Sequence, residues 1–173
     1  MQGGDEYLRT LQCNNNAYNL DSSANWLNYS WTTDQSNFYT FAQRLIAFRK
    51  AHPALRPATW YSTSQVAWYQ PSGAVATSSY WNNTSNYAIA YTINGPSLGD
   101  TNSMYIAYNG WSGSVTFTLP APPSGTSWYR VTDTCNWNDG ANTFVTPGNE
   151  SAIGGAGTNY SQCGQSLLLL ISK

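Results

Sequence analysis

Short apolar segments alternate with turn sequences throughout the chain from residue 60 onward. Clusters of glycine, proline, serine and asparagine separate these segments, as in Pro71-Ser72-Gly73 and Pro122–Gly125. Such runs predict β-strands, and strands that follow one another without helices between them favour an antiparallel sandwich. The clearest predicted strands are Gln65–Tyr69, Tyr87–Ile93, Met104–Tyr108, Val115–Leu119, Trp128–Thr132 and Ser166–Ser172.

Three short sequences refine this picture. The dipeptide Asn109-Gly110 stands between apolar runs and predicts a tight hairpin. The run Leu167–Ile171 is continuously apolar but far shorter than the roughly 20 residues that span a bilayer, so it predicts a buried strand. Gly154–Gly157 predicts a flexible loop within the sandwich.

Residues 37–51 have a different period, typical of an amphipathic helix. Aromatic and aliphatic residues recur there at spacings of three and four. Ser36 is the predicted N-cap, the basic residues Arg49 and Lys50 suit the C-terminal dipole, and Pro53 ends the helix. We expect the apolar stripe to stay exposed unless the sandwich covers it. The stripe comprises Phe38, Phe41, Leu45, Ile46 and Phe48.

The first 36 residues lack a sustained period and are rich in asparagine, serine, threonine and tyrosine. A polar segment of this length predicts a functional loop rather than an element of the core. Its expected anchors are Trp26, Leu27, Tyr29 and Trp31. We expect residues 1–36 to be poorly ordered in solution, which amide exchange would test.

Charge is scarce in this chain of 173 residues. Charged residues make up 9% and the net charge is −1, against roughly 25% charged residues in a typical domain. A nucleic-acid ligand is not expected because no basic face is visible, and no segment predicts membrane attachment. His52 is the only histidine and Cys-x-x-Cys is absent, so we expect neither a metal site nor a cofactor, and a structural role for His52.

Three cysteines leave one without a partner. Cys135 and Cys163 lie in the same β-rich half, so a disulfide is possible, with two buried free thiols as the alternative. Cys13 would then pair with something outside this chain.

The adjacent carboxylates Asp5 and Glu6 are the obvious candidates for an acid–base pair. Neighbours on an extended strand point to opposite faces, so they cannot both address one glycosidic oxygen. No other acid stands in a recognisable catalytic motif. These isolated acids are Asp21, Asp34, Asp100, Asp133, Asp139 and Glu150.

Tryptophans in the β half could stack on sugar rings. Strand aromatics usually pack in a core, so we expect most of these to be buried. Trp81 and Trp111 are the expected exceptions because they lie at turns. The full set is Trp60, Trp68, Trp81, Trp111, Trp128 and Trp137.

Three groups of segments carry a resemblance to a known family. Residues 3–10, 14–18 and 21 resemble the end of the catalytic barrel in debranching enzymes of the alpha-amylase superfamily, and residues 41–56 resemble its last helix. Residues 107–110, 117–120 and 128–134 resemble the C-terminal β-sandwich of the isoamylase type. The resemblance implies a mostly β chain in which the last loop and helix of a (β/α)8 barrel, residues 1–57, precede an antiparallel β-sandwich, residues 58–173.

The family hydrolyses α-1,6 branch linkages of glycogen and amylopectin, using carboxylates on earlier barrel strands that nothing here matches. The resemblance therefore implies a fragment that is inactive alone, with the upstream part of the same polypeptide and branched α-glucan as partners, and a secreted location. It places seven residues as lining or ordering the substrate cleft, although Asp5 and Asn14–Asn16 could instead serve only backbone groups. The seven are Asp5, Glu6, Arg9, Asn14, Asn15, Asn16 and Tyr18.

Two other functions remain open for the β half. Its turn-located tryptophans suit a carbohydrate-binding module. Alternatively, it is a purely structural accessory domain that packs on the barrel.

Overall fold

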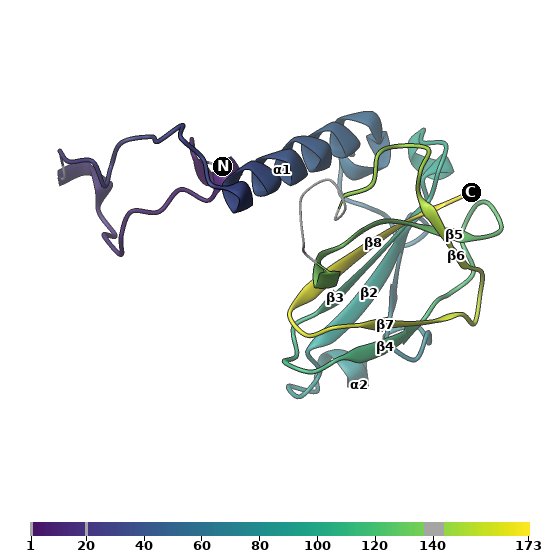
Figure 1. Ribbon diagram of the computed structural model, residues 1–173. Coiled ribbons are helices and arrows are strands. Elements are labelled where there is room, and N and C mark those ends of the chain that lie inside the picture. Colours follow the sequence, from purple (N-terminus) through teal and green to yellow (C-terminus); the bar gives the residue numbers. More distant parts are fainter. Residues whose placement is uncertain (1, 20, 137–143) are drawn as a thin grey trace.

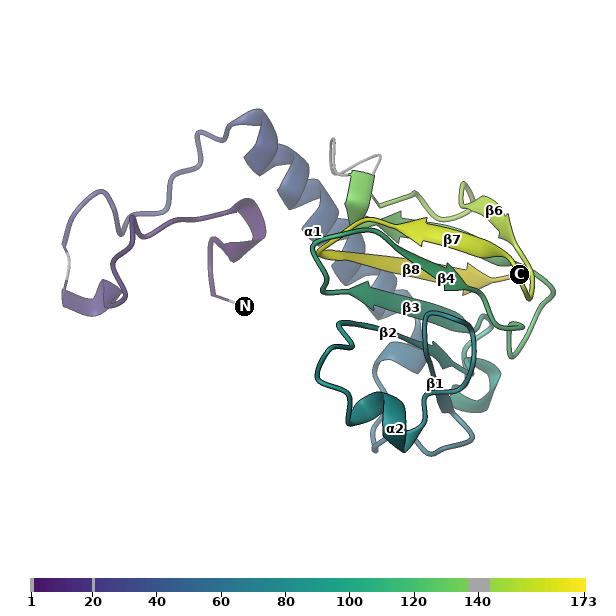
Figure 2. The ribbon, with the colours of Figure 1, turned by 90° about the horizontal axis from the view of Figure 1, so that it is seen from below.

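The computed structural model describes residues 2–19, 21–136 and 144–173. Two β-sheet layers form its C-terminal part, and helix α1 (Thr33–Ala51) packs against the larger sheet (Figure 1). The segment before α1 extends away from the sheets in both ribbon views (Figure 2). Trp137 and Asp139, named among the candidate residues, lie outside the described residues.

All neighbouring strands in both sheets are antiparallel, so the predicted antiparallel sandwich is confirmed. The larger sheet has six strands in the order β1-β2-β3-β8-β5-β6 and the smaller pairs β4 with β7. The larger sheet contains β1 (Val66–Tyr69), β2 (Ala88–Ile93), β3 (Met104–Asn109), β5 (Trp128–Asp133), β6 (Ser151–Gly154) and β8 (Ser166–Ser172). The smaller contains β4 (Val115–Thr118) and β7 (Asn159–Gln162).

Short helical turns connect these elements. Helix α2 (Ser78–Trp81) lies between β1 and β2, and the sequence analysis did not predict it. The single-turn 3-10 helices are η1 (Asp5–Tyr7), η2 (Ala17–Asn19), η3 (Pro53–Leu55), η4 (Pro96–Leu98) and η5 (Thr134–Asn136).

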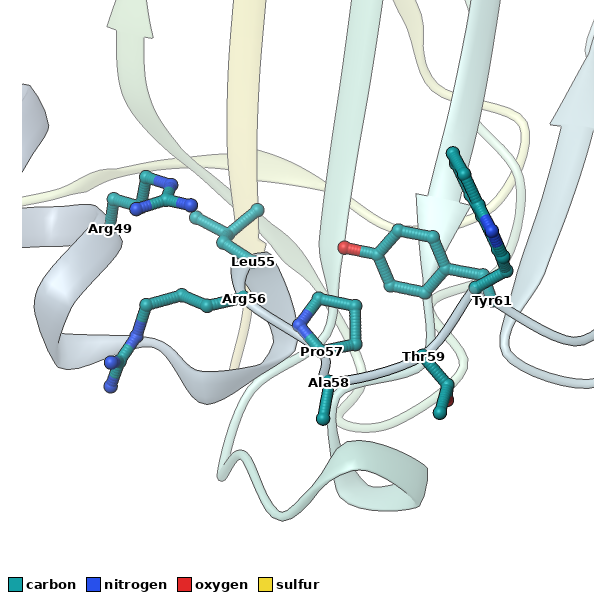
Figure 3. A pocket seen from close by; sticks show the side chains of 8 residues that line it. Arg49, Leu55, Arg56, Pro57, Ala58, Thr59 and Tyr61 are labelled. Carbon is teal, nitrogen blue, oxygen red and sulfur yellow. The ribbon is translucent and has the colours of Figure 1, made fainter.

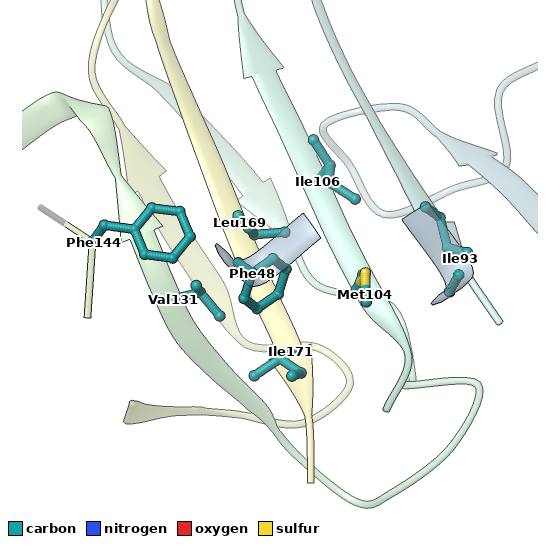
Figure 4. Packing of buried hydrophobic residues seen from close by; sticks show 9 residues of the cluster. Phe48, Ile93, Met104, Ile106, Val131, Phe144, Leu169 and Ile171 are labelled. Carbon is teal, nitrogen blue, oxygen red and sulfur yellow. The ribbon is translucent and has the colours of Figure 1, made fainter. Parts of the chain in front are cut away.

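Strand β8 separates two hydrophobic clusters on opposite faces of the larger sheet. Leu168 and Leu170 face the β4–β7 layer, where Phe117 and Trp128 are fully buried. Leu169 and Ile171 face the other way, toward α1 (Figure 4). A strand buried on both faces cannot alternate apolar with polar residues, which explains its continuous apolar run.

One end of α1 completes the second cluster. Phe48 is 6% exposed and packs among residues of β3, β5 and β8, beside Phe144 (Figure 4). The Phe144 ring also meets Phe41 edge-on at 5.7 Å, and its carbonyl accepts a hydrogen bond of 2.6 Å from Arg44 Nη1. The sandwich thus covers part of the helix stripe, while Leu45 stays 42% exposed.

The N-terminus of α1 differs from the prediction. Thr32, not Ser36, is the N-cap: its hydroxyl accepts from Gln35 N, and Gln35 Oε1 accepts from Thr32 N. This reciprocal capping box satisfies two backbone donors, which a lone serine one turn later cannot do. Arg49 and Lys50 do lie in the last turn.

The hairpin predicted at Asn109-Gly110 is wrong. Strand β3 continues through Asn109, and the chain then crosses to β4 in the other sheet. The fully buried Asn109 amide donates to the carbonyls of Gly113 and Cys163 and accepts from Trp111 N at 3.0 Å. Its side chain organises a crossing between layers, a role that the turn pattern did not reveal.

Candidate functional site

Asp5 and Glu6 lie in the tight turn η1 and not on an extended strand, so their side chains are not forced to opposite faces. Gly4 enters this turn with φ of 100°, a left-handed conformation that favours glycine. The Asp5 carboxylate accepts from Gln2 N at 2.8 Å, and that of Glu6 accepts from Gly4 N at 2.9 Å. Each carboxylate therefore orders its own loop.

The asparagines further along form a second local network. Asn14 Oδ1 accepts from Asn16 N at 2.9 Å, and Asn16 Oδ1 accepts from Tyr18 N at 3.3 Å. Asn15 is exposed, and the Tyr18 side chain is 99% exposed. Asn14 and Asn16 hold the backbone in shape, whereas Tyr18 presents an uncovered ring.

Arg9 joins distant parts of this segment. Its guanidinium donates to Gly3 O at 3.0 Å and to Asn25 Oδ1 at 3.4 Å, and Asn25 in turn donates to Ala17 O. Arg9 also lines a hollow of about 190 Å³ together with Trp26 and other polar residues. The structure describes the other six candidate cleft residues, and none of them lines this hollow. The seven candidates therefore do not share this pocket.

The anchors of this segment differ from those expected. Trp31 stacks on Tyr7 at 5.0 Å and meets Tyr39 of α1 at 4.8 Å, so its role as an anchor is confirmed. Tyr29 lies 5.9 Å from Tyr7 and 6.4 Å from Trp31 between ring centroids, so it belongs to the same aromatic group although it is 70% exposed. Trp26 is 66% exposed and Leu27 41% exposed. The buried ring is Tyr7, which sits in the turn η1 and which sequence spacing did not single out.

Most described tryptophans of the β half are exposed, contrary to expectation. Trp128 is fully buried between the sheets, but Trp68, Trp81 and Trp111 are about half exposed and Trp60 is 94% exposed. The large rings buried with Trp128 in this cluster are Tyr105 and Phe117, and no other described tryptophan belongs to it. Exposure of Trp81 and Trp111 was predicted and is confirmed.

Two adjoining hollows lie beside α2. The larger, of about 350 Å³, is lined by Tyr80, Trp81, Tyr87 and Tyr108 with asparagine side chains between them. The smaller, of about 190 Å³, shares Tyr80 and Tyr87 and adds Trp111. Rings with amides between them suit ligands that have both apolar faces and hydroxyl groups.

A third hollow, of about 450 Å³, lies where the chain leaves α1 for the sandwich (Figure 3). Arg49 and Arg56 stand on one side of it and Tyr61 on the other, and Trp60 is also among its lining residues. Tyr61 is fixed by a hydrogen bond of 2.7 Å from its hydroxyl to Ala54 O.

Comparison with known proteins identifies the family. The model of the family "Isoamylase, C-terminal" matches residues 65–171, which begin just before β1 and end one residue before the end of β8. The chain belongs to this family.

Similar proteins extend the match from this region to the whole chain. Isoamylase from Pseudomonas amyloderamosa is 87% identical over 173 residues, which is 100% of this chain and 22% of that protein. The chain therefore spans about a fifth of the length of this relative.

Solved structures support the fold. Pullulanase from Bacillus acidopullulyticus superimposes with a TM-score of 0.69 at 22% identity, covering 99% of this chain and 18% of that one. A pullulanase complexed with maltotetraose, from Anoxybacillus sp. LM18-11, gives 0.58 at 17% identity over 99% of this chain and 20% of that one.

The described residues contain one disulfide. Cys135 and Cys163 are bonded, with 5.5 Å between their Cα atoms, so the free-thiol alternative is excluded. Cys13 is exposed and free in the described chain. Within the described residues no cluster of metal-ligating side chains occurs, and no helix is long and apolar enough to cross a bilayer.

A pair formed by the half-buried Tyr160 and the buried Asp133 lies near this disulfide. The Tyr160 hydroxyl donates to Asp133 at 2.5 Å, and Asp133 also accepts from Cys135 N at 2.8 Å. Burial, together with the hydrogen bond to Asp133, raises the pKa of Tyr160 to about 12. A tyrosine held in its neutral form is a structural donor rather than a catalytic acid at neutral pH.

Proposed function

We propose that this chain is the C-terminal part of a debranching glycoside hydrolase that cleaves α-1,6-glucosidic branch linkages in glycogen and amylopectin. The observation that carries the proposal is the 87% identity to an isoamylase over all 173 residues. The pullulanase that binds maltotetraose supports an α-glucan as the substrate class.

In this proposal residues 1–57 complete the catalytic barrel and residues 58–173 form the accessory sandwich. The contact of Phe48 with the sheet core would hold the two parts together. The catalytic carboxylates would lie elsewhere in the complete protein, so the chain alone is expected to be inactive.

The N-terminal segment would form one wall of the substrate cleft. Arg9 lines a hollow and Tyr18 presents an open ring, so these two would contact glucan directly. Asp5, Glu6, Asn14 and Asn16 would act mainly by holding the loop in shape. Asn15 is exposed beside them and would also face the cleft.

Release of reducing ends from amylopectin tests the activity. The complete protein should release them, while the 173-residue chain should not. Turnover by the chain alone, or none by the complete protein, would contradict the proposal.

Substitutions in the complete protein test the cleft assignment. Arg9→Ala and Tyr18→Ala should raise the KM for amylopectin several-fold, while Asp21→Asn, an exposed carboxylate in the same segment, should not. An unchanged KM in both variants would remove these residues from the cleft.

The disulfide supports an oxidising location, and we include secretion in the proposal. Cell fractionation of the producing organism tests it, since the activity should appear outside the cytoplasm.

A further inference from the structure

An aromatic surface on the sandwich plays no part in the proposed cleft. It consists of Trp81, Tyr87, Tyr108 and Trp111, each 50–53% exposed. These residues come from α2, the position just before β2, the end of β3 and the loop that follows β3. Figure 1 shows α2 on the side of the sheets away from α1.

The rings are held in place by their neighbours. Tyr87 and Trp111 stack at 5.2 Å with planes 26° apart, and Trp81 meets Trp68 edge-on at 5.5 Å. Gly113 lies against the Trp111 indole, where an added Cβ would stand 3.2 Å from the ring. The surface is therefore preorganised, which lowers the entropic cost of binding a ligand.

Two asparagines stand among these rings with fixed orientations. Asn86 Nδ2 donates to Tyr80 O at 2.8 Å, and Asn83 Oδ1 accepts from Ser85 N at 3.0 Å. Within the described chain the side-chain oxygen Oδ1 of Asn86 and the side-chain nitrogen Nδ2 of Asn83 have no protein partner. Both atoms therefore remain available to a ligand. An acceptor and a donor between aromatic faces match the hydroxyl groups of a sugar.

The lining excludes other ligand classes. Both hollows beside α2 are lined without any lysine, arginine, aspartate or glutamate. Phosphate, nucleotide or a charged peptide would lose hydration there without a countercharge. A pyranose ring has apolar C–H faces for the aromatic rings and neutral hydroxyls for the amides.

We propose that this aromatic surface binds a neutral α-glucan chain, as a second contact remote from the cleft. The α-linkage rests on the proposed function, whereas the neutral sugar class rests on the lining itself. Such a site would hold a branched polymer on the protein while the cleft acts on another part of it.

Binding of maltoheptaose to the 173-residue chain, followed by tryptophan fluorescence and calorimetry, tests the proposal. Trp81→Ala and Trp111→Ala should each weaken binding by about tenfold, the effect of one lost ring contact. Asn83→Ala, at an exposed loop position, should weaken binding several-fold without disturbing the rings.

The matched control is Trp60→Ala, which removes an exposed tryptophan from the hollow beside α1 and should leave the Kd unchanged. Near-UV circular dichroism checks that each variant is folded. Wild-type chain that does not bind maltoheptaose, or binding abolished by Trp60→Ala alone, would overturn the proposal. Equal binding of a β-1,4-linked glucan would confirm a sugar surface but overturn its α-glucan assignment.

The two proposals fail separately. A complete protein that releases reducing ends, with a chain that binds no glucan, would leave the debranching function intact and remove the surface site. If the 173-residue chain binds maltoheptaose but the complete protein releases no reducing ends, the surface site stands and the debranching function is removed.

Discussion

His52 Nδ1 lies 3.1 Å from both carboxylate oxygens of Asp100, which joins the end of α1 to the loop before β3. The imidazole also lies against the Phe48 ring at 4.2 Å. Asp100 is 7% exposed and accepts a further bond from Asn102 N at 3.2 Å. The only histidine of the chain thus connects the helix to the sandwich.

Asp100→Ala should lower the free energy of unfolding by about 2 kcal/mol, because His52 and the backbone N–H groups of Ala54 and Asn102 lose their shared acceptor. Urea unfolding measures the change. Asp21→Asn, which alters an exposed carboxylate, is the control and should have little effect. Equal stability of the two variants would mean that the His52–Asp100 contact contributes nothing.

Asn109→Ala should destabilise the chain by about 3 kcal/mol, since two carbonyls and the Trp111 amide lose a buried partner at once. Asn15→Ala, at an exposed position, provides the comparison. One hydrogen bond usually contributes about 1 kcal/mol to stability. A decrease in the free energy of unfolding smaller than about 1 kcal/mol would therefore rule out the organising role of Asn109.

Replacing both Cys135 and Cys163 by serine should cost about 3 kcal/mol, because the bond closes a loop with a sequence separation of 28. Cys13→Ser should not change stability, since that thiol is exposed and free in the described chain. Unfolding with and without a reductant separates the bond from the substitutions: the reductant should affect only chains that retain both cysteines.

Thr32→Ala should lower stability by about 1 kcal/mol through loss of the capping box. Ser36→Ala should cost less than half as much, because Ser36 lies inside the first turns of the helix. Thermal unfolding of the two variants decides between the observed cap and the one expected from sequence; a larger loss for Ser36→Ala would favour the latter.

Tyr160→Phe should cost about 2 kcal/mol at pH 8 by removing the hydrogen bond to buried Asp133. The folded-state pKa of about 12 exceeds the unfolded value of about 10. The stabilisation from Tyr160 is therefore complete below pH 10 and lost as pH rises through 12, because the unfolded state releases the proton first.

The stability gap between wild type and Tyr160→Phe should accordingly narrow between those two pH values. Urea unfolding at pH 8 and at intervals up to pH 12 measures it. Tyr18→Phe, whose ring is 99% exposed, serves as control. A gap that widens with pH would contradict this sign.

Most of the fold could be predicted from local patterns, because the six strongest strands combine apolar residues with clear turns at their ends. Strands β6 and β7 have the sequences SAIG and NYSQ; the small residues of the first and the polar residues of the second give little strand signal. They form only by pairing with β5 and β4, a tertiary effect. The layer crossing at Asn109 was missed for the same reason, since its partners are distant in sequence.

The candidate sites were less predictable than the fold. Sequence identified the polar N-terminal segment but not that its carboxylates and amides bond to their own backbone. Trp81 and Trp111 were selected because they lie at turns, whereas Tyr87 and Tyr108 lie at strand ends where a ring is more often buried. Only the arrangement of β2, β3 and α2 brings these four rings to one surface.

The position of β8 constrains the order in which the protein can fold. The last strand in the sequence is central, so β1–β3 and β5–β6 meet only through residues 166–172. During synthesis both halves of the sheet leave the ribosome with an open edge, and neither cluster can close until β8 follows. Removing these few residues would therefore separate the sheet into two parts rather than shorten it at one side.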